Sequence, residues 1–479
     1  MSGCEFTLEE LRHDKPREEC GVVGVFNHPE AANLAYLSLY AQQHRGQEGA
    51  GIVSYNAEDD EFHTIKGQGL VPDIFSHAKL QKLPGNFAIG HNRYSTAGGA
   101  GLKNVQPLVA KSALGTIAMA HNGNLTNADL LREQLEEQGA IFQSSIDSEV
   151  LLHLIARSRE KSFPRRIIDA IAQVKGGFSL IFLTEDSLVG VRDPHGFRPL
   201  SLGRFLDGGY VLASETCAFD LIGAEFERDI RPGEMVVING SEVSSCMPFQ
   251  IHEGAFCIFE YVYFSRVDSK IGGNTVWTVR KNQGRFLARE TPVEADVVIP
   301  VPDSGVATAM GFAEESGIPY EMGLIRNHYV GRTFIEPQSS IRHFGVKIKL
   351  NPVREVIEGK RVVVVDDSIV RGTTSRKIVE MIRRAGAREV HMRIGSPKII
   401  SPCFYGIDTP TREELIGSSN NVEEIRQHLT ADTLGYLSEE GLLAASPKLG
   451  GYCTACFSGN YPVNVVFDKP EQGGLFQGG

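Results

Sequence analysis

One stretch of this sequence constrains the fold more than any other: an unbroken run of valines that ends in two aspartates and a hydroxyl-rich turn. Residues 362–375 read V-V-V-V-D-D-S-I-V-R-G-T-T-S. A short, continuous apolar run is typical of a strand that is buried on both faces of a parallel sheet. The turn that follows opens a helix, whose first backbone N–H groups can bind an anion. We therefore expect an α/β domain with a phosphate site beyond the carboxyl end of this strand.

Two acidic residues and a second loop fit the same kind of ligand. Asp366 and Asp367 could accept hydrogen bonds from sugar hydroxyls or hold Mg²⁺, although acids at a strand end can also simply cap the next helix. The segment P-V-P-D-S-G, residues 300–305, follows another apolar strand, and its Ser304 could contact a second phosphate group. The basic, glycine-containing segment 326–335 could close over a pyrophosphate.

These segments resemble the phosphoribosylpyrophosphate-binding signature of phosphoribosyltransferases. The resemblance implies an α/β type I phosphoribosyltransferase domain with one Mg²⁺ per subunit, held by Ser304, Asp366 and Asp367. It also implies that phosphoribosylpyrophosphate is bound by a set of loop and lid residues. These are Asp366, Asp367, Ser368, Arg371, Gly372, Thr373, Thr374 and Arg332.

The pattern of apolar runs changes near residue 290 and divides the chain into two parts. Before it, many short apolar runs are separated by Gly-rich turns, with helical patterns near 30–43, 127–138 and 147–160, which predicts an α+β layered domain. After it, apolar strands alternate with helical segments, which predicts a parallel sheet covered on both faces. We expect a propeptide at 1–19, a first domain at 20–265, a second at 266–465 and a tail at 466–479.

Composition excludes several classes of protein. Forty-eight basic against 59 acidic residues give a net charge of −11, so a global basic footprint for nucleic acid is absent. No apolar run approaches the ~18 residues that a membrane-spanning helix needs. Eight cysteines in 479 residues are too few for a disulfide scaffold, and the N-terminus lacks a secretory pattern. We expect a cytoplasmic protein that binds neither nucleic acid nor membrane.

Cys20 is the candidate nucleophile of the first domain. A lone cysteine before a strand is ordinarily a buried structural residue. Here it is followed by Q-H-R-G-Q-E-G-A-G (43–51), G-H-N-R-Y-S-T-A-G (90–98), A-H-N-G-N-L (120–125) and S-I-D-S-E (145–149). With these segments, the first half of the chain resembles the N-terminal-nucleophile (Ntn) glutamine amidotransferases, which implies a layered αββα fold.

That resemblance assigns a role to each residue of a glutamine site. Removal of residues 1–19 would make Cys20 the first residue, and its free α-amine, with a pKa of about 7.7–8.0, could act as the base for its own thiol. An amide N–H and a backbone N–H aimed at one oxygen stabilise a tetrahedral intermediate. By the resemblance, Asn122 and Gly123 form this oxyanion hole, Arg93 binds the glutamine carboxylate, Asp147 binds its ammonium and Arg45 supports the surroundings of the nucleophile.

Four further cysteines have the spacing or context of metal ligands. Cys453 and Cys456 form a C-x-x-C pair, whereas Cys257 and Cys403 lie far upstream. A lone C-x-x-C can be a redox pair, a zinc site or neither, and spacing does not join it to the other two. Many glutamine phosphoribosylpyrophosphate amidotransferases hold a structural [4Fe–4S] cluster with cysteines in these contexts, so the resemblance implies one cluster per subunit. A four-cysteine zinc site is the nearest alternative.

The two halves, in this order, resemble the glutamine phosphoribosylpyrophosphate amidotransferase family from Cys20 to about Pro462. The resemblance implies that glutamine is hydrolysed at Cys20 and that its ammonia converts phosphoribosylpyrophosphate to 5-phosphoribosylamine, the first committed step of purine synthesis. It also implies a homotetramer that is inhibited by purine nucleotides. Two alternatives are an amidotransferase with a different second domain, such as a glucosamine-phosphate or asparagine synthetase, and a non-catalytic phosphoribosylpyrophosphate sensor that regulates transcription. The 362–375 loop disfavours the first, and the intact nucleophile and net charge disfavour the second.

Overall fold

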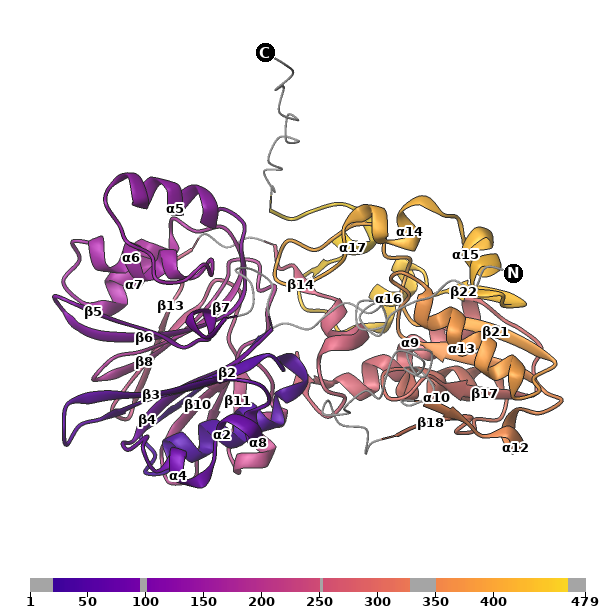
Figure 1. Cartoon of the computed structure of the whole chain (residues 1–479), viewed down its shortest axis with the longest axis horizontal. Coiled ribbons are helices and arrows are strands. Elements are labelled where there is room, and N and C mark those ends of the chain that lie inside the picture. Colours follow the sequence, from indigo (N-terminus) through magenta and orange to yellow (C-terminus); the bar gives the residue numbers. More distant parts are fainter. Residues whose placement is uncertain (1–19, 95–100, 250–252, 328–349, 464–479) are drawn as a thin grey trace, which may run out of the picture.

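The computed structural model describes residues 20–94, 101–249, 253–327 and 350–463, and these form two domains that lie beside each other (Figure 1). The first domain, drawn in indigo to pink, contains two stacked sheets with helices outside them. The second, drawn in salmon to yellow, contains a smaller sheet between helices. The expected propeptide 1–19, residue Arg332 and the whole expected tail 466–479 lie outside the described residues.

One sheet of the first domain has seven antiparallel strands and carries Cys20 just before its central strand. Its order is β11 (Glu225–Asp229), β9 (Ser201–Arg204), β10 (Tyr210–Ala213), β1 (Gly21–Phe26), β4 (Phe87–Arg93), β2 (Gly49–Asn56) and β3 (Glu61–Gln68). The outer face of this sheet packs on α2 (Ala31–Ala41), α3 (Val71–Ile74), α4 (His77–Leu80) and α8 (Cys217–Ile222). The short helix η1 (Gln43–Arg45) leads from α2 into β2.

The other sheet has six antiparallel strands. Its order is β13 (Glu242–Cys246), β12 (Met235–Asn239), β8 (Ser187–Arg192), β7 (Gly176–Leu183), β6 (Gly115–Leu125) and β5 (Leu108–Ser112). Its outer face packs on α5 (Ala128–Glu137), α6 (Glu149–Arg157) and α7 (Phe163–Ile171). The helix η2 (Leu102–Asn104) precedes β5.

The pleat of the strands builds the core of this domain. Along β1, Val23 and Val25 pack against the helices, while Val22 and Phe26 point into a second apolar cluster between the two sheets. This alternation follows from the period of two in a strand. The result is a four-layer αββα arrangement, as the resemblance implied.

The second domain is built on four parallel strands with helices on both faces. The order is β17 (Val297–Pro300), β20 (Arg361–Asp366), β21 (Glu389–Ile394) and β22 (Thr433–Tyr436). One face packs on α9 (Val276–Glu290), α10 (Val306–Ser316) and α16 (Glu439–Ala445). The other face packs on α13 (Thr373–Arg384) and α15 (Val422–Leu429). The prediction of a doubly covered parallel sheet is confirmed.

Short elements complete the chain. They are β14 (Phe256–Cys257), the π-helix η3 (Glu260–Phe264), β15 (Lys270–Ile271), β16 (Asn274–Thr275), β18 (Leu324–Arg326), β19 (Leu350–Pro352), α12 (Arg354–Ile357), η5 (Arg412–Glu414), α14 (Ile416–Ser419), β23 (Tyr452–Cys453) and α17 (Ala455–Ser458). The pairing of β14 with β23 brings the end of the first domain beside residues 452–453, near the end of the described part of the chain. Within the described ranges, no helix is both long enough and apolar enough to cross a bilayer.

Candidate active site

Cys20 lies where the central strand of the seven-stranded sheet begins. Gly21 is paired with Asn92 of β4, so Cys20 lies beside Arg93, the last residue of that strand. The thiol is buried, and its Sγ is 3.7 Å from the carbonyl oxygen of Tyr94. Burial lowers the pKa of Arg93, and the nearby thiol of Cys20 opposes that effect. Two predicted site residues are thus adjacent.

Arg45 contacts the backbone of the same cysteine. Its side chain is 1% exposed, and its Nε donates to the carbonyl oxygen of Cys20 at 3.4 Å. Its terminal nitrogens donate to two buried carboxylates, Glu215 and Glu260, with distances of 3.0 and 2.7 Å to the two oxygens of Glu260. The guanidinium of Arg45 is therefore engaged by acceptors of the protein itself.

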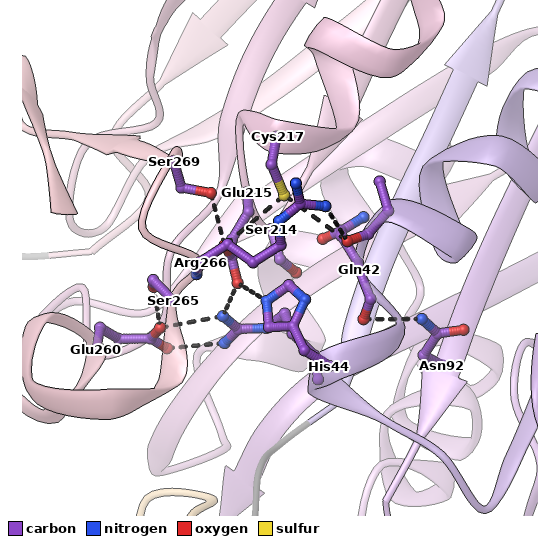
Figure 2. Close-up of polar contacts among 12 residues, drawn as sticks. Gln42, His44, Asn92, Ser214, Glu215, Cys217, Glu260, Ser265, Arg266 and Ser269 are labelled. Atoms are coloured by element: carbon purple, nitrogen blue, oxygen red, sulfur yellow. Dashed lines mark hydrogen bonds and ion pairs between the residues drawn. The ribbon is translucent and has the colours of Figure 1, made fainter. Parts of the chain in front are cut away.

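The two carboxylates belong to a buried polar network, drawn in Figure 2. Glu215 also accepts from Ser269, from the backbone N–H of Arg266 and from His44, while Glu260 also accepts from Ser265 and Arg198. Burial alone would raise both pKa values. His44 and Arg45 outweigh it at Glu215, and Arg45 and Arg198 lower the pKa of Glu260 to about 2, so both acids stay ionised.

The sequence interpretation did not include Glu215, Glu260 or Arg198. An isolated glutamate carries no local pattern that predicts a buried partner. Charged residues are almost never fully buried unless they are paired. This rule could have indicated a partner for each glutamate only if its burial had been known, and sequence alone does not give the burial.

The predicted oxyanion residues lie on β6, in the sheet stacked on the one that contains the nucleophile's strand. Asn122 is fully buried, and its Nδ2 is 3.5 Å from the hydroxyl of Ser214. The same hydroxyl accepts from the backbone N–H of Val22 at 3.0 Å, which ties Asn122 to β1. Gly123 has φ +137°, and a Cβ there would lie 2.0 Å from the carbonyl oxygen of Gly177. Only glycine fits this position.

Asp147 is held by backbone donors just before α6. It accepts from the N–H groups of Leu125 and Ser148, each at 2.8 Å, and its Oδ1 is 3.7 Å from Nδ1 of His121. Burial would raise the pKa of Asp147, but His121 and the backbone donors keep it below its ordinary value. The carboxylate therefore stays ionised near neutral pH and can attract a cation.

The second predicted site lies at the carboxyl edge of the parallel sheet. Strands β17 and β20 are neighbours, and a Cβ on Gly305 would lie 2.4 Å from the carbonyl oxygen of Val365, so the two predicted loops touch. Asp366 and Asp367 are buried at the end of β20, and Ser368 donates to Asp367 at 2.6 Å. Ser304 is half-buried in the neighbouring loop.

The loop after β20 leads into the N-terminus of α13, which can bind an anion. Gly372 has φ +81° and precedes α13, whose first two residues are Thr373 and Thr374. The hydroxyl of Thr373 is buried and has no hydrogen-bond partner among the described residues. A helix N-terminus with such a hydroxyl is a ready site for phosphate. Arg371 forms an ion pair with Glu414 at 2.8 Å on the rim of this loop.

The four candidate ligand cysteines, far apart in sequence, line one pocket. Cys257 and Cys453 are register partners in the parallel pair of β14 and β23. Cys456 lies on α17 and Cys403 in the loop after β21. The other lining residues are Phe259, Ile399, Tyr405, Ile407, Thr409, Ala455 and Tyr461. Burial raises the pKa of the Cys257, Cys453 and Cys456 thiols, and each is raised further by other cysteines of the set.

The two domains meet at this pocket. The ring of Tyr405 stacks on Phe197 of the first domain, with centroids 4.2 Å apart. The side chain of Asn124, on the same strand as Asn122, donates to the carbonyl oxygen of Phe404 at 3.0 Å. The loop that carries Cys403 therefore contacts the strand that carries the oxyanion candidates.

Comparison with known proteins covers both domains. Residues 91–220 match a family described as a glutamine amidotransferase domain, and residues 283–394 match a phosphoribosyl transferase domain. The amidophosphoribosyltransferase of Bacillus subtilis is 53% identical over 457 residues, 94% of this chain and 95% of that protein. The chloroplastic amidophosphoribosyltransferase 1 of Arabidopsis thaliana is 56% identical over 464 residues, 96% of this chain and 81% of that protein.

Solved structures show the same likeness. The glutamine phosphoribosylpyrophosphate amidotransferase of B. subtilis, complexed with ADP and GMP, has a TM-score of 0.89 at 52% identity, covering 94% of this chain and 99% of that one. A structure described as the allosteric regulatory enzyme of purine biosynthesis also has a TM-score of 0.89 at 52% identity, covering 94% and 97%. Coverage this wide leaves neither domain outside the comparison.

Proposed function

This chain belongs to the amidophosphoribosyltransferase family, and from that premise we propose how its two sites divide the reaction. The enzyme is a glutamine amidotransferase and phosphoribosyltransferase of purine biosynthesis. It uses the amide nitrogen of glutamine to convert phosphoribosylpyrophosphate to 5-phosphoribosylamine, with release of pyrophosphate and glutamate. The observation that carries the assignment of the first site is the buried Cys20 beside Arg93, at the start of a strand whose Val22 is linked through Ser214 to Asn122.

Glutamine is cleaved at Cys20. The sulfur attacks the side-chain amide carbon, and the oxygen that becomes negative is stabilised by the Asn122 amide and the Gly123 N–H. Collapse breaks the carbon–nitrogen bond and releases ammonia, and water then cleaves the thioester to give glutamate and the free thiol. Arg93 binds the substrate carboxylate and Asp147 its ammonium, which the ionised state of Asp147 supports.

Removal of residues 1–19 supplies the base for this step. A cysteine at the start of the chain carries an α-amine that can take the thiol proton and later deliver it to the leaving nitrogen. While the propeptide is attached, that nitrogen is an amide and cannot do so. The position of Cys20 immediately before β1 supports this proposal.

Ammonia is used at the edge of the parallel sheet. It attacks the ribose C1 while the bond to pyrophosphate breaks, and the α13 N-terminus with Thr373 and Thr374 holds the ribose phosphate. Carboxylate and hydroxyl oxygens are the ligands that Mg²⁺ prefers, so Asp366, Asp367 and Ser304 fit that ion. The bound ion would offset charge on the leaving pyrophosphate. Ser368, Arg371, Gly372 and, outside the described residues, Arg332 complete the proposed ligand set.

A [4Fe–4S] cluster fits the cysteine pocket better than zinc. Four sulfurs around one zinc lie about 3.8 Å apart, from Zn–S bonds of about 2.3 Å in a tetrahedron. Only Asp59, Glu61 and His63, among the described residues, bring three ligand atoms within 4.8 Å of one another, so no three of these sulfurs do. Ligands on four different irons are spaced more widely. Cys257, Cys403, Cys453 and Cys456 would hold the cluster, which ties the chain end to both domains.

Regulation and assembly extend the proposal. The B. subtilis relative was solved with ADP and GMP, which supports inhibition of this enzyme by purine nucleotides. A homotetramer, a cytoplasmic location and the domain limits 20–265 and 266–465 stay predictions. The plant relatives are named chloroplastic, so location varies among the relatives.

The test is Cys20→Ala in anaerobically purified enzyme, with an intact-mass check that the wild-type chain begins at Cys20. We expect synthesis with glutamine to be lost and synthesis with high ammonia to remain, because the second site is untouched. Loss of both activities would show that the two sites are not separable as proposed. Retention of glutamine use would remove Cys20 from the mechanism.

A further inference from the structure

We propose that Glu260 is a positioning residue for the nucleophile: it acts through Arg45 and makes the geometry of Cys20 depend on the segment that joins the two domains. The inference rests on the proposed role of Cys20. It concerns a buried carboxylate at one edge of the network drawn in Figure 2, where Arg45 donates to both of its oxygens.

The contact between Arg45 and Cys20 gives the network its influence on the nucleophile. Arg45 reaches the Cys20 carbonyl through Nε and both oxygens of Glu260 through its two terminal nitrogens. A guanidinium is a planar, rigid fork, so acceptors on one edge set the position of the other. A displaced Glu260 therefore displaces the donor that holds the nucleophile's backbone.

Glu260 is itself held from several sides. Arg198, with no exposed side-chain surface, donates to Oε1, and Ser265 donates to Oε2. Both carboxylate oxygens are thus saturated by donors. Arg45 donates to both oxygens, and a guanidinium has no acceptor, so a glutamine in this place would turn an N–H toward a group that can only donate. Both oxygens of Glu260 are therefore needed.

The segment that carries Glu260 is fixed by the second domain. Arg280 of α9 donates to the carbonyl oxygens of Tyr261, Tyr263 and Ser265, at 2.8, 2.7 and 2.8 Å. Three residues before Glu260 lies Cys257, which lines the cysteine pocket. The position of Glu260 therefore depends on α9 and on that pocket, although the residue it influences lies in the first domain.

The variants are Glu260→Gln, Ser265→Ala and, as a matched control, Glu234→Gln. Glu234 is 1% exposed, against 0% for Glu260, and accepts from both terminal nitrogens of Arg228 and from the N–H of Arg231. None of these contacts among the described residues involves the network around Arg45. Each enzyme is purified anaerobically with its iron content and N-terminus checked. Four quantities are measured: kcat and KM for glutamine, the ammonia-dependent rate, and the rate of Cys20 alkylation by iodoacetamide.

We expect Glu260→Gln to lower the glutamine kcat about tenfold or more, since small misplacements of a reacting group cost this much. The glutamine KM should change little, because Arg93 and Asp147 still bind the substrate, and the ammonia-dependent rate should stay within about twofold. The rate of Cys20 alkylation by iodoacetamide should differ from wild type in the same variants in which the glutamine kcat falls. Ser265→Ala removes one donor to Glu260 and should lower kcat by a smaller factor, while Glu234→Gln should change neither activity.

A parallel fall of both activities would overturn the proposal, because it would mean a purely structural role. A normal glutamine kcat in Glu260→Gln would overturn it as well. If that variant does not fold, Ser265→Ala decides: a kcat equal to wild type would refute the inference. Cys20→Ala in the same assay separates the two levels, because glutamine use by that variant would refute the proposed nucleophile rather than the role of Glu260.

Discussion

Replacement of Gly123 by alanine tests the oxyanion hole most directly. Gly123 pairs with Phe178 across β6 and β7 and has φ +137°, a conformation that L residues rarely adopt. The added Cβ would lie 2.0 Å from the carbonyl oxygen of Gly177, 2.8 Å from its carbon and 3.0 Å from Cα of Phe178. All three are backbone atoms of a central strand, so no side chain can rotate to make room.

The size of the expected effect follows from these distances. Ordinary contact begins at 3.4 Å, so the Cβ and the Gly177 oxygen must separate by 3.4 − 2.0 = 1.4 Å. A shift of that size moves the Gly123 N–H away from the developing oxyanion. Loss of one such donor costs about 10²–10³ in kcat, or about 3–4 kcal/mol of barrier. Backbone strain adds a stability cost of about 1–3 kcal/mol.

The assay compares glutamine-dependent with ammonia-dependent synthesis in Gly123→Ala, together with its thermal midpoint. We expect the glutamine kcat to fall at least about 100-fold and the ammonia-dependent rate to persist. Gly139→Ala is the matched control, because Gly139 has φ +87° with nothing within 4 Å of the added Cβ, so it carries strain without a clash. A glutamine kcat within about threefold of wild type in Gly123→Ala would refute the assignment of this N–H.

Three further predictions concern other parts of the molecule. Asp367→Ala should impair synthesis with both glutamine and ammonia, since both nitrogen sources meet at the ribose site; unchanged steady-state kinetics would remove Asp367 from it. Anaerobically purified enzyme should contain about four irons per chain by metal analysis. A content of about one zinc per chain would instead show that the four cysteines form a zinc site. Burial lowers the pKa of His91 from 6.5 to about 3, so the unfolded chain binds a proton that the native state does not. Stability should therefore be lost as pH falls from about 6.5 toward 3, by at most about 5 kcal/mol. His91→Gln should flatten this part of the pH dependence in urea unfolding, and an unchanged slope would contradict the buried neutral state.

Some of the fold and of the site is written in short stretches of sequence. The strand and loop at 362–375 hold a buried β-run, two acids and a helix start within fourteen positions, and the structure places them as β20 and α13 in a doubly covered sheet. Such a unit is predictable because its hydrogen bonds and burial pattern are set by near neighbours. The motif around Asn122 and Gly123 is local in the same way. The structure adds the reason for its glycine, which is the carbonyl oxygen of Gly177 on the neighbouring strand.

Tertiary structure alone decided the contacts between distant residues. Arg45 meets Glu215 and Glu260 across 170 and 215 positions, and neither glutamate differs in sequence from an ordinary surface acid. Sequence spacing likewise did not join Cys257 and Cys403 to Cys453 and Cys456; only the resemblance grouped them, and the structure places all four around one pocket. Periodicity reports which face of a segment is buried, whereas the pairing of buried charges and ligands depends on which segments close on one another. That choice is made by the packing of the whole chain, because a charge can be buried only where its partner arrives at the same place.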